Sequence, residues 1–393
     1  MNIFEVGGKF EFDWMWYIQS QGFFVRRALP IVADSAVEDA TDIDIWGIRF
    51  FPPMAHSLAV VDCRDRGKRS KTYERILWAK GMAAYVGADQ VYVAPPKATW
   101  KTIDFGRRGG IHVVPYEIIE RHLESLPPRR GAYGQARFDL YRDFFAKRRV
   151  VLKGQPDIAA RLFEARSLYL LGSALTNINR AIEGLKASAD SLSHVNGEPE
   201  RQTLWLFDCC EFIAAFALNL LRVAEETFTL SEADRKRFVL KRLTYGDFPP
   251  KKAEEILRLS HQLALAHAQH AVPPGDRPTI TIPAPVAQSL EPPEYAVEVH
   301  GLLERIIQKP MLYWGGLKAL DAILFECIVH RLEATTGNIA CLHEEAEAFE
   351  VMKTAKNYIA VVCDAARIPR APFWVKSASP LAEDGTGSHD SLL

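Results

Sequence analysis

The sequence predicts an α/β N-terminal domain, with helices on both faces of a mixed sheet, followed by a mainly α-helical C-terminal domain. Two patterns carry this prediction. Up to residue 126, short β-branched and aromatic runs alternate with helical segments, and beyond residue 156 apolar residues recur with the helical period. With 393 residues, of which 48% are hydrophobic and 25% charged, the chain is long enough for two or three globular domains.

The N-terminal elements begin with an amphipathic helix over residues 9–20, which ends at Gln21-Gly22 and precedes the strand FFVRRALPIV. Two further strands, Ile43–Phe51 and Ser57–Val61, flank a break that contains Pro-Pro, and we expect them to pair antiparallel. Helices and strands then alternate: helix 72–87, strand 90–94, helix 98–108, strand 111–114 and helix 115–126.

The C-terminal half is expected to be helical, with a proline-rich interruption that cannot continue a helix. Candidate helices are 156–188, 201–228, 231–242, 250–270, 294–308, 315–336 and 338–366. The expected domains and connections are 1–126 (α/β), 127–154 (basic linker), 155–270 (helical), 271–293 (Pro-rich linker or strap), 294–376 (helical continuation) and 377–393 (disordered tail).

The basic segment 127–154 interleaves cations with aromatic residues. Such a pattern can stack bases while the cations hold phosphates. The alternative, which we favour, is a linker with an amphipathic helix packed on the first domain.

Charge and cysteine usage bound the function further. Residues 1–150 carry net positive charge and the remainder net negative charge, which favours an anionic ligand on the N-terminal part. The six cysteines form no C-x-x-C pair, so we expect reduced, buried thiols in a cytoplasmic protein.

The apolar run Trp205–Leu221 contains Asp208, Glu211 and Asn219, so it predicts a buried helix rather than a membrane span. No Walker motif and no G-x-G-x-x-G motif is present.

Acidic residues mark the ends of the two central strands. Asp42 and Asp44 begin the first strand, and Asp62 ends the second. Because side chains alternate between faces along a strand, pairing of the strands would bring Asp44, Asp62 and Arg64 together. Two carboxylates suit Mg²⁺, and a nearby cation stabilises a pentacoordinate phosphate. A basic run that suits a nucleic-acid backbone follows: Arg66, Lys68, Arg69 and Lys71.

A second interpretation of the same residues needs no metal. Aspartates commonly end strands as turn residues, and a run of cations is commonly a solvated face. The residues alone leave both interpretations open.

The order of motifs from about Phe10 to Leu126 resembles the PD-(D/E)XK nuclease superfamily, which has the restriction-endonuclease-like fold, and within it the Mrr-like and RecB-like branches. DIDIWG is similar to the metal-binding aspartate motif of this superfamily, and VVDCR is similar to its (D/E)xK half-motif. GADQVYVAPPKATW resembles the supporting strand and following loop, and DFGRRGGIHVVP resembles the helix-to-strand closure of Mrr-like domains. The resemblance covers roughly the first third of the chain.

The resemblance implies a catalytic role for three carboxylates. Asp44 and Asp62 would be the ligands of a Mg²⁺ or Mn²⁺ cofactor. Glu11, on the first helix, would orient a metal-bound water.

The chain departs from the family at the lysine position, which holds Arg64. An arginine stays charged and cannot serve as a base. Three alternatives remain: Arg64 stabilises transition-state charge, the lysine role has moved to Lys68, Lys71 or Lys80, or the domain binds nucleic acid without cutting it.

The expected function is therefore a metal-dependent nuclease that cleaves phosphodiester bonds, with DNA favoured over RNA. Restriction or phage defence is the role that the resembled branches suggest. The helical region is expected to bind a protein partner or to self-associate. The alternative function is a non-catalytic nucleic-acid-binding or assembly protein built on a degenerate nuclease fold.

Overall fold

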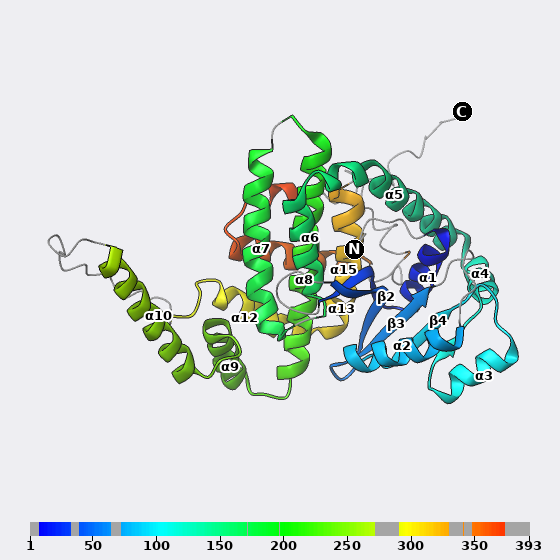
Figure 1. The fold of residues 1–393 in the computed structure, drawn as a ribbon, viewed down its shortest axis with the longest axis horizontal. Coiled ribbons are helices and arrows are strands. Elements are labelled where there is room, and N and C mark those ends of the chain that lie inside the picture. The colour runs from blue at the N-terminus through cyan, green and yellow to red at the C-terminus, as the bar shows by residue number, and fades with distance from the viewer. Residues whose placement is uncertain are drawn as a thin grey trace, which may run out of the picture.

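A computed structural model describes residues 8–32, 39–63, 72–170, 172–195, 197–271, 291–329, 341 and 348–373. Within these ranges, an N-terminal five-stranded mixed sheet with its helices lies beside a larger, mostly helical region (Figure 1). This arrangement confirms the predicted order of an α/β part followed by a helical part. Most of the strap expected at 271–293 lies outside the described residues. The tail expected at 377–393 lies wholly outside them.

The N-terminal elements follow the predicted order closely. They are α1 (Lys9–Ser20), β1 (Phe24–Val32), β2 (Asp39–Phe51), β3 (Ala55–Cys63), α2 (Thr72–Val86), β4 (Gln90–Ala94), α3 (Trp100–Arg108), β5 (His112–Val113) and α4 (Tyr116–Glu124). The strands lie in the order β1-β2-β3-β4-β5. The first three form an antiparallel meander, and β4 and β5 then add in parallel. Each parallel step requires a crossover, which α2 and α3 supply.

Alternate residues of the central strands face opposite layers. On one face, Ile45 and Val61 belong to a buried cluster with Trp14 of α1. On the other face, Trp46 and Val60 belong to a second cluster that includes α2 and the helical region. The expectation of helices on both faces of the sheet is therefore confirmed.

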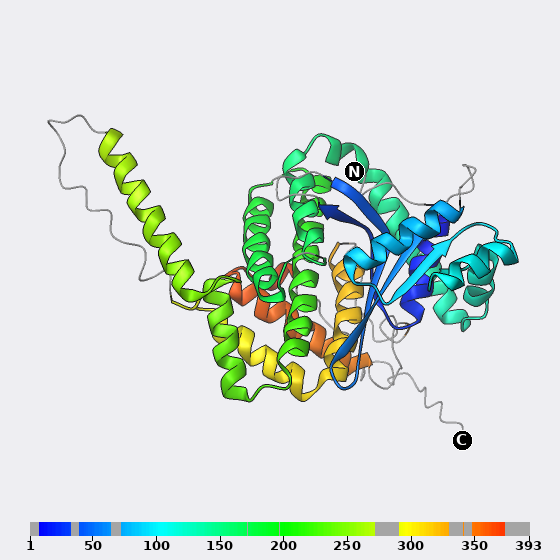
Figure 2. The same ribbon diagram turned by 60° about the horizontal axis from the view of Figure 1, so that its bottom comes forward.

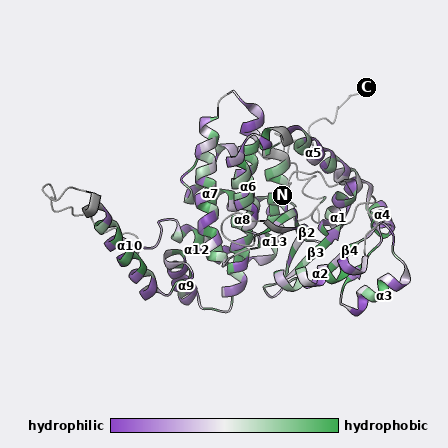
Figure 3. Cartoon of the chain, in the orientation of Figure 1, coloured by the Kyte–Doolittle hydropathy of each residue, from purple (hydrophilic) through white to green (hydrophobic). Residues whose placement is uncertain are grey.

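The helical region consists of a series of helices around a buried centre. Its described elements are α5 (Pro128–Lys153), α6 (Pro156–Ser167), α7 (Ala174–His194), α8 (Pro199–Thr227), α9 (Glu232–Tyr245), α10 (Pro250–Ala271), α12 (Ala296–Gln308), α13 (Pro310–Ala322), a π-helical turn (Ile323–Val329), α15 (Ala348–Ala365) and a 3₁₀ turn (Ala371–Phe373). Figure 3 shows apolar residues concentrated in the sheet and in the central helices.

Helix α8 lies at the centre of this region and packs against α6, α7, α12, α13 and α15. Among the described helices, α8 alone has the length and hydropathy of a membrane span, and 94% of its apolar window is buried inside the protein. The burial of the Trp205–Leu221 run matches the expectation of a core helix.

The segment 127–154, expected as a linker, contains one 26-residue helix, α5. Its aromatic residues face the protein: Tyr133 lies edge-on to Trp16 of α1 at 5.8 Å between ring centroids, and Phe138 lies 5.1 Å from Phe12. Gly134 is required here, because a Cβ at this position would lie 2.6 Å from Nε1 of Trp16. Packing on the first domain therefore accounts for Tyr133 and Phe138, while Phe144 packs against Phe207 of α8.

Two other helix boundaries differ from the prediction. The single helix expected at 156–188 is two helices, α6 and α7, separated by a turn in which Gly172 has φ of +77°. A side chain at this left-handed position would be strained, which explains the break. The helix expected from residue 315 begins earlier, at Pro310, because proline is favoured in the first helical turn.

The sheet and the helical region share one hydrophobic core. A single cluster of buried residues includes Phe24 and Trp46 in the strands, Phe212 in α8 and Phe373 near the end of the described chain. Cys63, Cys209, Cys210, Cys341 and Cys363 are buried free thiols, as expected for these five cysteines.

Candidate active site on the paired strands β2 and β3

The register of β2 against β3 places Asp44 beside Asp62. Ile45 pairs with Val61, so the next position along the antiparallel ladder sets Asp44 opposite Asp62. Oδ2 of Asp44 accepts a hydrogen bond of 2.6 Å from the backbone N–H of Cys63, the residue directly after Asp62. The two carboxylates that the sequence pattern singled out are therefore neighbours.

Arg75 of α2 binds the Asp62 carboxylate through both of its oxygens. Nε of Arg75 donates to Oδ2 at 3.1 Å, and Nη2 donates to Oδ1. The Asp62 side chain is only 2% exposed. The guanidinium also lies over the Trp78 ring, 4.1 Å from its centroid, which holds Arg75 in place. Asp62 is thus a buried carboxylate whose charge is compensated.

Asp44 lies in a different electrostatic environment. Burial raises the pKa of Asp44 to about 7, the neighbouring Asp62 adds to the rise, and the hydrogen bond from Cys63 opposes it. Glu11 and Asp42 also raise the pKa of Asp44. Within the part of the chain that the structure describes, no cation forms an ion pair with Asp44. Two carboxylates this close repel each other unless a positive charge lies between them.

Glu11 contributes negative potential to this site from α1. Its Oε2 accepts a hydrogen bond of 2.7 Å from Nη2 of Arg27 on β1. Burial raises the pKa of the Cys63 thiol well above its ordinary value, and Asp44 and Glu11 add to the rise. Glu11 therefore lies near the Asp44 site, but its carboxylate is bound to an arginine.

Of the cationic residues predicted for this site, the structure describes Lys80. Arg64, Arg66, Lys68, Arg69 and Lys71 all lie outside the described residues. Lys80 is exposed on α2, and its Nζ would lie 3.6 Å from a Cβ built on Gly110, which precedes β5. Because Asp62 lies where β3 ends and Gly110 lies where β5 begins, the structure places Lys80 toward the opposite edge of the sheet.

Asp44 and Asp62 are of the donor type that a hard divalent cation takes, and both oxygens of Asp62 also accept hydrogen bonds from Arg75. Carboxylate oxygens are the ligands that Mg²⁺ prefers, and Mg²⁺ keeps several of its waters, so one or two carboxylates are enough. The elevated pKa of Asp44 reflects first its burial and then the negative charge of Asp62, and a cation would offset this charge. In the described ranges, no group of three or more histidine, cysteine or acidic side chains is arranged to hold a metal.

Sequence reasoning missed the two arginines of this site. Arg75 is 13 positions from Asp62, and Arg27 is 16 positions from Glu11. A basic residue in the first turns of α2 was a usable signal for Arg75, because α2 must pass over the end of β3. Nothing in the strand pattern distinguished Arg27 from its neighbour Arg26.

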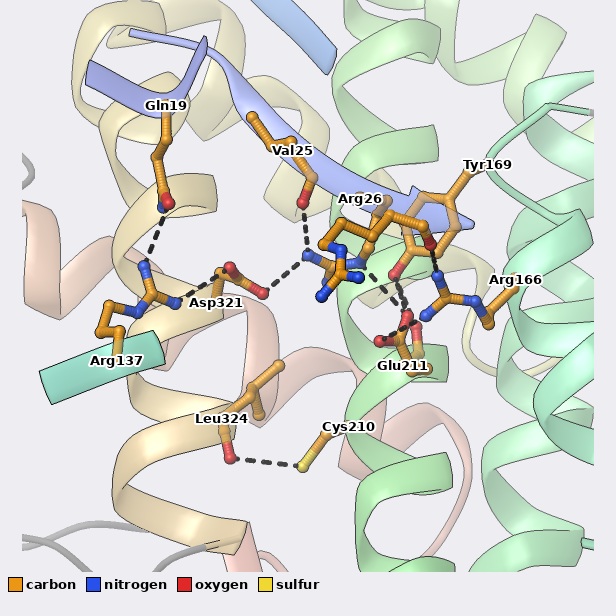
Figure 4. A network of polar contacts seen from close by, with 11 residues as sticks. Gln19, Val25, Arg26, Arg137, Arg166, Tyr169, Cys210, Glu211, Asp321 and Leu324 are labelled. Atoms are coloured by element: carbon orange, nitrogen blue, oxygen red, sulfur yellow. Dashed lines mark hydrogen bonds and ion pairs between the residues drawn. The ribbon is translucent and has the colours of Figure 1, made fainter. Parts of the chain in front are cut away.

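A second charged cluster lies buried between the sheet and the helical region (Figure 4). Arg26 of β1 donates to Glu211 of α8 at 3.2 Å and to Asp321 of α13 at 2.7 Å. Arg166 of α6 reaches Glu211 at 3.4 Å, and Arg137 of α5 reaches Asp321 at 3.5 Å. All five side chains are at most 11% exposed.

The partners of Arg26 keep it charged. Burial lowers the pKa of Arg26, but Asp321 and Glu211 raise it more, so that the pKa stands above its ordinary value. This cluster connects β1 with four helices and is a joint between the two parts of the fold.

Comparisons of the chain with protein-family models, with curated protein sequences and with solved structures return no match. The arrangement of the chain's own residues is therefore the basis on which a function is assigned.

Proposed function

We propose that this protein is a metal-dependent nuclease whose active site is formed by Asp44 and Asp62. The observation that carries the proposal is the adjacency of these two carboxylates on the paired strands β2 and β3, with the pKa of Asp44 raised to about 7. Strongly perturbed carboxylates with a specific charged neighbour are typical of functional sites.

The residues have separate roles in this proposal. Asp44 and Asp62 would hold the divalent cation, and Arg75 fixes the Asp62 carboxylate in one orientation. A bound Mg²⁺ would lower the pKa of a water and offset charge on the phosphate. Arg75 lies close enough to Asp62 to stabilise negative charge on a phosphate bound there. Arg64, two residues after Asp62, is the second candidate for this role.

The order of elements supports membership of the PD-(D/E)XK superfamily as part of the proposal. The observed series of α1, a three-stranded meander, α2, β4, α3 and β5 is the series on which the resemblance rests. Asp44 lies in the first half of β2 and Asp62 near the end of β3, on paired strands. The restriction-endonuclease-like fold is therefore our working assignment for the N-terminal part.

The test is metal-dependent cleavage. The wild-type protein should cut nucleic acid with Mg²⁺ or Mn²⁺ and not with EDTA. The double variant Asp44→Ala plus Asp62→Ala should lose this activity. Cleavage that survives in the double variant would remove the assignment.

A second candidate function is binding of nucleic acid without cleavage, and two features of the site favour it. The Arg75 fork already binds both oxygens of Asp62, and Arg64 occupies the lysine position. Both features suit a protein that binds nucleic acid at this site without cutting it. Salt-sensitive binding without cleavage in either metal would favour this candidate, since electrostatic binding to phosphates weakens with salt.

For the helical region, we propose self-association through α10. This helix projects away from the rest of the protein (Figure 2). Ile256, Leu259 and Leu263 form a stripe along it, and Leu263 is 71% exposed. The same helix carries both lysines and glutamates in its first turns, so two copies can pair their charges.

A further inference from the structure

The candidate site and the start of α3 lie at the same edge of the sheet. Strands β3 and β4 are parallel and end together, with Asp62 paired to Val93 and Cys63 paired to Ala94. The chain leaves β4 at this edge and enters α3 at Trp100. Residues 95–100 therefore follow directly from the strand that neighbours Asp62. In open α/β sheets, ligands bind in the crevice beyond the carboxyl ends of parallel strands.

The direction of α3 is fixed by its contacts with α2. The ring of Tyr73, near the start of α2, packs edge-on against Phe105 at 5.0 Å. Lys80, further along α2, lies near Gly110, which follows α3. The two helices therefore run side by side in the same direction, and Trp100 lies toward the end of α2 at which Arg75 binds Asp62.

Trp100 is the most exposed tryptophan among the described residues, with 68% of its surface accessible. Its backbone is held by a helix cap, because Oγ1 of Thr99 accepts a hydrogen bond from the N–H of Thr102. The guanidinium of Arg107 lies 5.7 Å from the Trp100 ring centroid. A large aromatic ring is thus presented to solvent from a fixed backbone, beside a cation.

The surroundings of Trp100 are positively charged. Residues 95–110 contain four cationic side chains and one carboxylate. Lys97, Lys101, Arg107 and Arg108 are all exposed. The single acid, Asp104, forms ion pairs with the two arginines, at 2.9 and 3.3 Å. Net positive charge around an exposed ring complements a polyanion with unstacked aromatic groups.

We infer that Trp100, with Lys97 and Lys101, is a binding platform for single-stranded nucleic acid that leads the strand to the Asp44–Asp62 site. An unpaired base stacks on the indole, and the lysines hold the adjacent phosphates. A duplex presents no free base face, because its bases are already stacked on each other. This inference rests on the proposed nuclease function and adds its substrate class.

The experiment is fluorescence anisotropy with a labelled oligothymidylate, a labelled oligouridylate and a labelled duplex, all in EDTA so that no cleavage occurs. The wild-type protein should bind both single strands more tightly than the duplex. Loss of one base stack is worth about 1–3 kcal/mol, so Trp100→Ala should weaken binding of single strands roughly 5- to 150-fold. Trp100→Phe should retain most of the affinity, because phenylalanine also stacks.

A matched control removes an aromatic residue elsewhere. Tyr85, near the end of α2, is 66% exposed, and Tyr85→Ala should leave binding unchanged. Lys97→Ala plus Lys101→Ala should weaken binding and reduce its salt dependence. Tyr85, Lys97 and Lys101 are all exposed, so the control and the double lysine variant should fold like the wild type. Circular dichroism verifies this.

The outcomes separate this inference from the proposed function. Cleavage of nucleic acid with unchanged single-strand affinity in Trp100→Ala would overturn the inference and leave the nuclease standing. Trp100-dependent binding without cleavage in any metal would keep the inference and favour the non-catalytic candidate. Equal affinity for duplex and single strands, or no binding at all, would overturn the inference. The oligothymidylate and oligouridylate distinguish DNA from RNA.

Discussion

Oδ2 of Asp44 lies 2.6 Å from the backbone nitrogen of Cys63, and this contact holds the Asp44 carboxylate beside Asp62. The hydrogen bond satisfies one oxygen but does not supply a positive charge. Burial and Asp62 therefore raise the pKa of Asp44 to about 7. The site contains a carboxylate that is costly to ionise in the free protein, which is the condition under which a cation binds with most effect.

The pH dependence of stability follows from Asp44. Its ordinary pKa is 3.8, and the folded protein raises it to about 7, so between these values the folded state binds more protons than the unfolded state. The contribution of Asp44 to the free energy of unfolding is therefore fully present below the unfolded pKa of 3.8. It is lost as the pH rises toward 7. Asp44→Asn mimics the protonated acid and keeps the oxygen that Cys63 binds, so it should raise the melting temperature at pH 8 by several degrees.

Thermal melts at pH 5 and pH 8 check this prediction, because the gain should be much smaller at pH 5. Asp42→Asn removes a charge two positions earlier on β2, which adds the least to the rise in the pKa of Asp44, so its gain at pH 8 should be smaller than that of Asp44→Asn. Adding Mg²⁺ at pH 8 should stabilise the wild type and not Asp44→Asn. An equal gain for Asp44→Asn at both pH values would contradict the account of Asp44.

Arg75 is predicted to stabilise the folded protein by compensating the buried charge of Asp62. Arg75→Ala leaves a carboxylate that is 2% exposed without its bidentate partner, and we expect a loss of roughly 3 kcal/mol in the free energy of unfolding. The double variant Arg75→Met plus Asp62→Leu removes both charges and should recover much of this loss. Urea denaturation measures both values. If the single and double variants are equally destabilised, the broken ion pair is not the cause of the loss in the free energy of unfolding.

Much of the fold was predictable because it depends on local patterns. The alternation of Ile45 and Trp46 between two faces defined β2, and the same alternation defined β3. Register then followed from antiparallel pairing, which is why Asp44 and Asp62 were predicted to meet. Linkers were harder to predict. Helix α5 begins at Pro128, the second of two prolines, and contains Gly131 and Gly134, which indicate a linker until the contact between Gly134 and Trp16 is known.

The partners of the charged residues were not predictable from local patterns. Arg26 reaches Glu211 and Asp321, which are 185 and 295 positions away. Only the packing of the sheet against the helical region brings these charges together. The exposure of Trp100 was likewise hidden, because tryptophan in a helical pattern is commonly a core residue.

The buried cluster around Arg26 is predicted to stabilise the joint between sheet and helices. Arg26→Ala leaves Glu211 without one of its arginines and Asp321 without its shortest ion pair, and it should cost about 3–5 kcal/mol in the free energy of unfolding. Arg237→Ala is the control, because Arg237 is 79% exposed and pairs with Asp234 at the surface. That variant should change stability by less than about 1 kcal/mol. Similar losses in both variants would argue against a joint at Arg26.

Helix α10 is predicted to mediate self-association. Leu259→Asp plus Leu263→Asp places charges in the apolar stripe and should convert a dimer to a monomer. Light scattering coupled to size-exclusion chromatography measures the mass. The control Arg258→Asp, which lies off the stripe, should not change the measured mass. A wild-type protein that is monomeric at all concentrations would rule out this role for α10.

The measurement that tests the central claim most directly is cleavage of a substrate panel by the wild type and by Asp62→Asn. The panel is supercoiled plasmid, linear duplex, single-stranded DNA and RNA, each with Mg²⁺, Mn²⁺ or EDTA. The account predicts metal-dependent cutting by the wild type that Asp62→Asn loses while it still folds. Cutting in EDTA, or equal cutting by Asp62→Asn, would contradict a metal-dependent site at Asp44 and Asp62.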